Sequence, residues 1–460
     1  MDPIIKLVLV PDLSTVVGTA DPERVTYWLR EVALPGDRSR ALARLSADEL
    51  TALARFAATD DAVELLDSVD DELAARFLRA AEADDAVRLL DALDSDRVAD
   101  ILRELKGAPR QRILDLLPAQ RADRIRGLLS WPQDSAAAHM VPEMLTVSPG
   151  VTVAEAIAMV RAEANALRTD ARTGAYVFIV DDDARLGGVV GFRDLVLAEP
   201  ETPVDALADT DVRTVNALDD AEDAARALDA YDLVAVPVID EHGRLLGIVT
   251  EDDAADIAEE EATEDAERQG GSSPLDVPYL RASPLLLWRK RIVWLLLLFV
   301  AEAYTGTVLR AFEDEMEAVV ALAFFIPLLI GTGGNTGTQI TTTLVRAMAT
   351  GQVRLRDVPA VLVKELSTGS MVALTMALAA VIRAWTLGVG PEITLTVALT
   401  VAAIVMWSSL ISSILPPLLK KIRVDPALVS APLIATIVDG TGLIIYFMIA
   451  HATLPQLAGL

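Results

Sequence analysis

The chain has 460 residues, a net charge of −28 and no cysteine. Its length allows about three domains at roughly 150 residues each. Without cysteine it can form neither disulfides nor thiolate metal sites, and its three histidines argue against a histidine-based zinc site. Any metal is therefore expected to be held by oxygen atoms, which suits Mg²⁺ or Ca²⁺.

The acidic excess is confined to the first part of the chain. By count, residues 1–270 carry a balance of −30, whereas residues 271–460 carry +2. A dense carboxylate surface repels nucleic acid and attracts cations, so no nucleic-acid partner is expected. Salt adaptation or a GC-rich genome is an alternative source of this composition, since arginine greatly outnumbers lysine.

Residues 1–135 predict an acidic, all-α domain. The sequence DDAVELL at 60–66 recurs as DDAVRLL at 84–90, a shift of 24 residues, and apolar residues fall at helical spacing in each unit. This favours a superhelical stack of short helices, with a plain helical bundle as the alternative. The short apolar run at 4–10 lacks the features of a signal peptide, so the first 270 residues are expected in the cytosol.

Two similar α/β units follow, at residues 136–200 and 201–253. Each contains a helix (153–161 and 221–230), an apolar strand (175–180 and 234–239), a polar turn and a second strand (187–191 and 245–249). The order resembles a tandem pair of CBS domains, a regulatory module. Gly247, Thr250 and Asp253 have the spacing of ribose-phosphate contacts in that family, which implies ATP as a candidate ligand; a hinge that responds only to metal is the alternative.

The rest of the chain predicts an acidic connecting helix and a membrane domain. Residues 254–283 hold the helix, at 254–267, and the linker GGSSP at 270–274. Residues 284–460 contain five apolar segments long enough to span a bilayer, at 291–311, 317–345, 359–383, 392–418 and 426–450. Pro416 and Pro417 are expected to kink or end the fourth. Basic loops place the first 270 residues inside and the C-terminus outside.

Asp439 is the leading candidate for a functional residue in the membrane. It lies in the middle of the apolar fifth segment. A charged side chain at that depth costs about 2.5–3.5 kcal/mol on the most lenient scale, so it needs a partner charge, a wet cavity or a cation. Glu302 is a second carboxylate, in the first segment. It could serve the pore, serve an interface, or extend toward the outer surface.

The second candidate feature is the run from Pro327 to Gln339. Four glycines fall within residues 331–337, which predicts a weak or broken helix. Irregular backbone at membrane depth is tolerated where it is buried or lines a wet cavity. Its carbonyls, with Asn335, Thr336 and Gln339, could contact the water shell of a cation. Close packing of helices is the alternative.

From the domain order and these two motifs, the chain resembles the MgtE family of magnesium transporters. The resemblance extends to the run from Asp425 through Asp439 and Thr441 to Phe447. It implies a homodimer in the cytoplasmic membrane, in contact with lipid, with a pore lined by the second and fifth segments. The pore residues would be Asp439, Gly334, Asn335, Thr336, Gln339 and Thr441.

The resemblance also implies regulatory Mg²⁺ sites on the cytosolic side. The matching carboxylates are Asp232, Asp253, Asp256, Glu261, Glu264, Asp265 and Asp425, and the helical domain offers Asp94, Asp96 and Asp100. Mg²⁺ would bridge these groups and close the pore, with residues 254–267 acting as a plug.

The expected function is thus that of a Mg²⁺ channel or transporter gated by Mg²⁺. The alternatives are a transporter of Co²⁺ or Mn²⁺, a membrane-anchored CBS sensor that does not transport, and a CBS-bearing anion channel. An enzyme is not expected, because no nucleophile–base pair and no phosphate-cradling loop is found. The expected fold is a multi-domain membrane protein with an all-α superhelical domain, an α/β CBS pair and five transmembrane helices.

Overall fold

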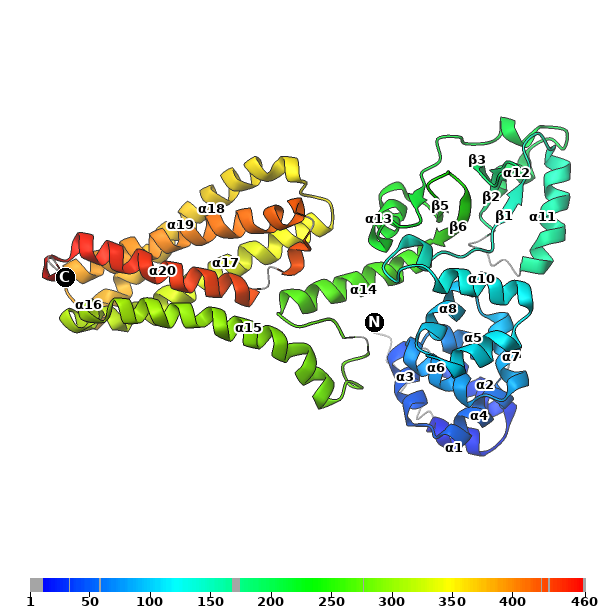
Figure 1. The fold of residues 1–460 in the computed structure, drawn as a ribbon, viewed down its shortest axis with the longest axis horizontal. Coiled ribbons are helices and arrows are strands. Elements are labelled where there is room, and N and C mark those ends of the chain that lie inside the picture. Colours follow the sequence, from blue (N-terminus) through cyan, green and yellow to red (C-terminus); the bar gives the residue numbers. More distant parts are fainter. Residues whose placement is uncertain are drawn as a thin grey trace, which may run out of the picture. The chain divides into compact units, whose positions relative to one another are not determined.

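The computed structural model describes residues 11–32, 34–57, 59–167, 174–275, 277–422, 424–428 and 431–457 (Figure 1). The apolar run predicted at 4–10 lies outside these residues. The chain forms two compact units, residues 1–259 and 260–460, which are described separately below.

The N-terminal domain is a stack of short helices, as predicted. Helices α4, α6, α8 and α10 pack in succession, and α5 packs against α7 in the same way (Figure 1). The 24-residue repeat falls on α5 and α7, which bury equivalent alanine and leucine positions. The helices are α1 (Leu13–Gly18), α2 (Pro22–Glu31), α3 (Pro35–Arg44), α4 (Ala47–Phe56), α5 (Thr59–Asp67), α6 (Asp71–Ala80), α7 (Ala83–Ala92), α8 (Ser95–Arg103), α9 (Ala108–Leu116) and α10 (Ala119–Leu129).

Arginine side chains cap the C-terminal ends of these helices. Helices this short leave many end carbonyls without intrahelical partners, and those ends carry partial negative charge. Arg97 of α8 donates to the carbonyl of Leu66 at 2.6 Å, and Arg121 of α10 donates to that of Asp91 at 3.0 Å. Arg76 and Arg88 serve the ends of α3 and α4 in the same way. Only a planar guanidinium can reach several carbonyls at once, which gives the arginine bias of this domain a structural reason.

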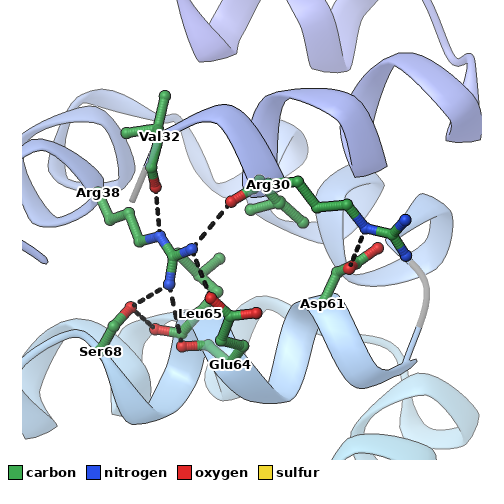
Figure 2. A network of polar contacts seen from close by, with 8 residues as sticks. Arg30, Val32, Arg38, Asp61, Glu64, Leu65 and Ser68 are labelled. Atoms are coloured by element: carbon green, nitrogen blue, oxygen red, sulfur yellow. Dashed lines mark hydrogen bonds and ion pairs between the residues drawn. The ribbon is translucent and has the colours of Figure 1, made fainter. Parts of the chain in front are cut away.

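Arg38 is the most buried of these caps, at 4% exposed (Figure 2). It donates to the carbonyls of Val32 at 2.6 Å and Leu29 at 2.9 Å, at the end of α2. It also donates to the Glu64 carboxylate of α5 at 2.7 Å and to the hydroxyl of Ser68, the residue after α5, at 3.2 Å. One guanidinium therefore joins three helices, α2, α3 and α5.

We predict that Arg38→Ala lowers the free energy of local opening around α2 and α5 by about 2–3 kcal/mol. The substitution leaves the Leu29 and Val32 carbonyls without this donor, which is costly for buried groups, whereas the Glu64 carboxylate is exposed and loses little. Hydrogen exchange of the full chain, read by mass spectrometry over residues 22–68, measures the change. The matched control is Arg40→Ala, which removes an exposed ion pair with Asp37 and should alter exchange little. Equal protection in both variants would contradict the capping role.

Two three-stranded sheets form the α/β units, and both predicted units are confirmed. The first sheet contains β1 (Leu145–Val147), β2 (Tyr176–Val180) and β3 (Leu186–Gly191), and the second contains β4 (Val215–Asn216), β5 (Ala235–Ile239) and β6 (Leu245–Thr250). In each sheet the first strand is parallel to the second, and the second is antiparallel to the third. The helices are α11 (Val153–Leu167), α12 (Phe192–Leu197) and α13 (Ala221–Tyr231), with short 3₁₀ turns at Ala136–Ala138 and Val204–Ala206.

The connecting helix α14 (Glu251–Gln269) starts directly after β6 and is longer than the predicted 254–267. The next part holds five helices that are long and apolar enough to cross a membrane, by length and composition. The helices of this part are α15 (Pro284–Ala311), α16 (Glu313–Ala318), α17 (Ile326–Ala349), α18 (Val358–Leu387), α19 (Pro391–Lys421) and α20 (Ala431–Thr453), with 3₁₀ turns at Val320–Phe325, Leu355–Asp357, Pro426–Leu428 and Pro455–Leu457.

Helix α17 packs against α19 and α20, α18 packs against α19, and α15 packs against α20 (Figure 1). Helix α19 continues through Pro416 and Pro417 to Lys421, so the prolines do not end it. One detail differs from the prediction: the glycine-rich run does not break its helix, since α17 is continuous from Ile326 to Ala349.

Candidate functional site

The glycines of α17 allow close helix packing in the membrane part. A Cβ at Gly333 would lie 2.6 Å from the Ile404 side chain of α19, and one at Gly337 would lie 2.5 Å from Ile434 of α20. Small residues permit such backbone approach, and packing drives helix association in lipid. The prediction of a broken helix was therefore wrong. Dense packing on two neighbours outweighs the low helix propensity of glycine.

Hydroxyl groups along these helices are largely bonded to backbone. Ser408 of α19 donates to the carbonyl of Gly333 at 2.8 Å, which ties α19 to α17. Thr336 donates to the Thr332 carbonyl at 2.8 Å. Thr441 donates to the Ile437 carbonyl at 2.7 Å and accepts a hydrogen bond from the Trp407 indole at 2.9 Å. Of the predicted pore residues, Thr336 and Thr441 thus stabilise helices as well as offering oxygen atoms.

Asp439 lies on α20 where that helix meets the glycines of α17. Its Oδ1 is 3.7 Å from the position of a Cβ at Gly334, an ordinary contact distance, so the carboxylate lies directly beside α17. Oδ1 is buried and has no hydrogen-bond partner in the described part of the chain. An ionised oxygen in this position is costly unless a cation, water or proton compensates it. The site thus fits a cation.

Asn335 and Gln339 are exposed side chains one turn apart on α17, so they share a face of the helix. Gly334 and Asn335 are adjacent, so this polar face begins beside the residue that receives Asp439. The structure thus places the predicted pore residues on two packed helices, α17 and α20.

A second cluster lies where α14 ends. Arg268 of α14 binds the Asp425 carboxylate at 2.9 Å and also pairs with Glu264, one turn earlier on its own helix. Asp425 accepts the backbone N–H of Ala427 at 2.8 Å as well. Two predicted Mg²⁺ ligands are therefore brought together, but by an arginine. Sequence reasoning missed Arg268, although its i,i+4 spacing from Glu264 was visible. Glu261 and Asp265 lie on the same helix and are partly buried.

Carboxylates also gather within the N-terminal unit. Burial raises the pKa of Asp96 well above its usual range, and the charges of Asp253, Asp100 and Asp94 add to the rise. Burial raises the pKa of Asp253 to about 7, with Asp252 and Asp256 adding to it and hydrogen bonds from Thr250 opposing it. Burial and Asp71 raise the pKa of Asp100 to about 7, against Arg103 and Arg97. Asp96 Oδ1 is buried with no hydrogen-bond partner among the described residues. The start of α8 and the start of α14 therefore face each other with mutually repelling acids.

The remaining predicted residues are Asp232, from the regulatory Mg²⁺ sites, and Gly247 and Thr250, from the nucleotide site. Asp232 is exposed and adopts a left-handed backbone at the end of α13. Thr250 donates to Asp253 at 2.5 Å, so this predicted nucleotide pair is in contact. A Cβ at Gly247 would instead meet the Val141 carbonyl at 2.8 Å and the Met140 side chain at 2.9 Å. This glycine is thus needed for close packing of the chain segment that enters the CBS pair.

Among the residues that the structure describes, no three Asp, Glu or His side chains lie close enough to hold a metal together. Mg²⁺ does not require such a cage, because it keeps several of its waters and often binds through one or two carboxylates. The pairs found here match that kind of site.

Comparison with known proteins agrees with the fold. Family models described as a divalent cation transporter, an MgtE intracellular N domain and a CBS domain match residues 326–449, 34–134 and 204–260. A magnesium transporter MgtE from Thermus thermophilus is 41% identical over 330 residues, which cover 72% of each chain. One from Bacillus subtilis is 33% identical over 334 residues, again 72% of each.

A crystal structure of the cytosolic domain of the Mg²⁺ channel MgtE in complex with ATP matches with 31% identity and a TM-score of 0.48, covering 54% of this chain and 99% of that one. The relatives from Thermus thermophilus and Bacillus subtilis, at 41% and 33% identity over 72% of this chain, show that this chain belongs to the MgtE family.

Proposed function

We propose that this protein carries Mg²⁺ across the cytoplasmic membrane, with Asp439 as the group that binds the ion in the pathway. The observation that carries the proposal is the buried, unpartnered Oδ1 of Asp439 inside a membrane helix. Asp439 is eight residues from the start of α20, or about 12 Å along the helix axis. At that depth a cation is the most direct compensation for the charge.

Mg²⁺ fits this site because it sheds water reluctantly. A hydrated ion needs one carboxylate for charge and a few polar groups for its waters. Asn335 and Gln339, exposed on α17, can provide these contacts. The exposure of these two side chains in a single chain supports a homodimer in which a second copy faces α17 and α20 across the ion path. The C-terminus is proposed to lie outside the cell. Co²⁺ or Mn²⁺ transport and a non-transporting sensor remain the competing functions.

We predict that Asp439→Asn lowers Mg²⁺ flux into liposomes by at least about tenfold, because it removes the charge that holds the ion but keeps the side-chain shape. The flux is followed with an internal Mg²⁺ dye, and Co²⁺ and Mn²⁺ are tested as competitors. The control is Glu313→Gln, which neutralises an exposed acid at the start of α16. Asp439→Asn flux equal to that of the parent would refute the assigned site. No Mg²⁺ flux in the parent would favour the sensor.

The end of α14 supports a gate that responds to cytosolic Mg²⁺. Glu264 and Asp425 meet through Arg268, so α14 is held to the segment before α20 by a tethered cation. Mg²⁺ at the neighbouring acids Glu261 and Asp265 would add to this attraction. When Mg²⁺ is scarce, repulsion among the acids of α14 would free its end. This is a two-state switch biased by a ligand.

We predict that Arg268→Gln raises the cytosolic Mg²⁺ concentration that half-closes the channel by several-fold. Loss of the arginine leaves the Glu264 and Asp425 carboxylates opposed, and more Mg²⁺ is needed to join them. Flux at graded Mg²⁺ on the cytosolic face measures the shift. Arg289→Gln, at an exposed arginine of α15, is the control. If Arg268→Gln closed at the same cytosolic Mg²⁺ concentration as the parent, the proposed role of the Arg268 contact in gating would be refuted.

A second regulatory contact is proposed between Asp96 and Asp253, whose burial and mutual repulsion favour a bridging Mg²⁺. With Mg²⁺, α8 and the start of α14 are held together; without it, the ionised acids weaken the contact. Asp256, three residues after Asp253 on α14, and Asp232, at the end of α13, are further candidates. ATP is proposed as a further ligand of this unit, on the spacing and contact of Thr250 and Asp253.

We predict that Mg²⁺ slows hydrogen exchange in residues 95–103 and 250–258 of the parent, whereas Asp96→Asn shows slow exchange with or without Mg²⁺. The substitution removes the buried charge that repels Asp253, so the metal is no longer needed there. Exchange is measured on the full chain at pH 7.5, with Glu241→Gln as an exposed control. Parent protection that does not respond to Mg²⁺ would exclude this site.

A further inference from the structure

We propose that Glu302 and Thr305 of α15 belong to the same ion site as Asp439, so that the two carboxylates and one hydroxyl of a single chain bind one hydrated divalent cation. The inference rests on the proposed function and extends it, since it assigns a role to the first membrane helix in binding the ion.

Helix α15 packs directly on the segment of α20 that carries Asp439. A Cβ at Gly440 would collide with the ring of Tyr304 and would lie 3.3 Å from the Thr305 hydroxyl. Glycine is therefore required next to Asp439 for α15 to approach. Glu302 and Thr305 are three residues apart and share a face of α15. Glu302 is exposed and lies one helical turn before Thr305 on α15.

The Thr305 hydroxyl is an independent sign of a missing ligand. The residue is 5% exposed, yet its Oγ1 has no hydrogen-bond partner in the described part of the chain. Thr307, two residues later on the same helix, instead donates to the Ala303 carbonyl at 3.0 Å. Asp439 Oδ1 is the other buried oxygen without a partner at this junction. Buried polar atoms without partners are rare and point to unplaced water or an ion.

Charge balance indicates the class of ion. Glu302 is eleven residues beyond Arg291, or about 16 Å along the axis of α15, so it lies deep in the membrane helix, as Asp439 does. No ion pair joins either carboxylate to a basic residue among those described. One divalent cation would neutralise both, whereas a monovalent cation would leave one charge uncompensated at membrane depth. The oxygen donors suit a hydrated Mg²⁺.

The test is Mg²⁺ flux into liposomes as a function of external Mg²⁺, with the full chain. We expect Glu302→Gln to raise the half-saturating concentration about tenfold, the loss typical of one charged ligand. Glu302→Asp, which keeps the charge, should stay within about threefold of the parent, and Thr305→Val should fall between these two. Glu313→Gln is the control for loss of an exposed acid.

Folding of each variant is checked by gel filtration and hydrogen exchange across α15 and α20. A folded Glu302→Gln with the half-saturation of Glu313→Gln overturns the inference and means that Glu302 faces lipid or bulk water. Loss of flux in Glu302→Gln that Glu302→Asp fails to restore also overturns it, because charge is then not the cause. Neither result touches the proposed function, which instead fails if Asp439→Asn conducts like the parent.

Discussion

The membrane part of this protein is organised around one constraint: a carboxylate cannot remain ionised deep in a bilayer without compensation. Asp439 has a buried oxygen with no partner among the described residues, where α20 packs against α17 and α15. Gly334 of α17 lets Ala435 of α20 approach, and Gly440, next to Asp439, lets Tyr304 and Thr305 of α15 approach. The helix packing and the proposed ion site therefore involve the same segment of α20.

The N-terminal unit is stabilised by a different interaction, between arginines and the carbonyls at helix ends. Its short helices expose many end carbonyls, and arginines such as Arg38 and Arg97 bind those carbonyls. These arginines hold the helical stack together, whereas Asp96 and Asp253 repel each other. In the proposed switch, arginine stabilises the fold and the repelling acids would be the groups that respond to a metal ion.

Arg268 joins the acidic helix α14 to the segment before the membrane helix α20. It occupies the place between Glu264 and Asp425 where a metal bridge was expected from the sequence. A tethered cation binds at any Mg²⁺ concentration, so it would set the resting strength of the contact that Mg²⁺ then increases. The proposed switch would need only a small change in bound Mg²⁺ to move between its states.

The sequence by itself determined the five membrane helices and both CBS-like units, and it made Asp439 the leading candidate, because hydrophobic length, strand patterning and an isolated charge in an apolar run are local properties. It could not decide the fate of the glycine run, which stays helical because α19 and α20 fill the space beside it. Nor could it reveal that Thr305 has no partner or that Arg268 joins Glu264 to Asp425. Those facts depend on which side chains meet between segments far apart in the chain, and only the tertiary packing decides that.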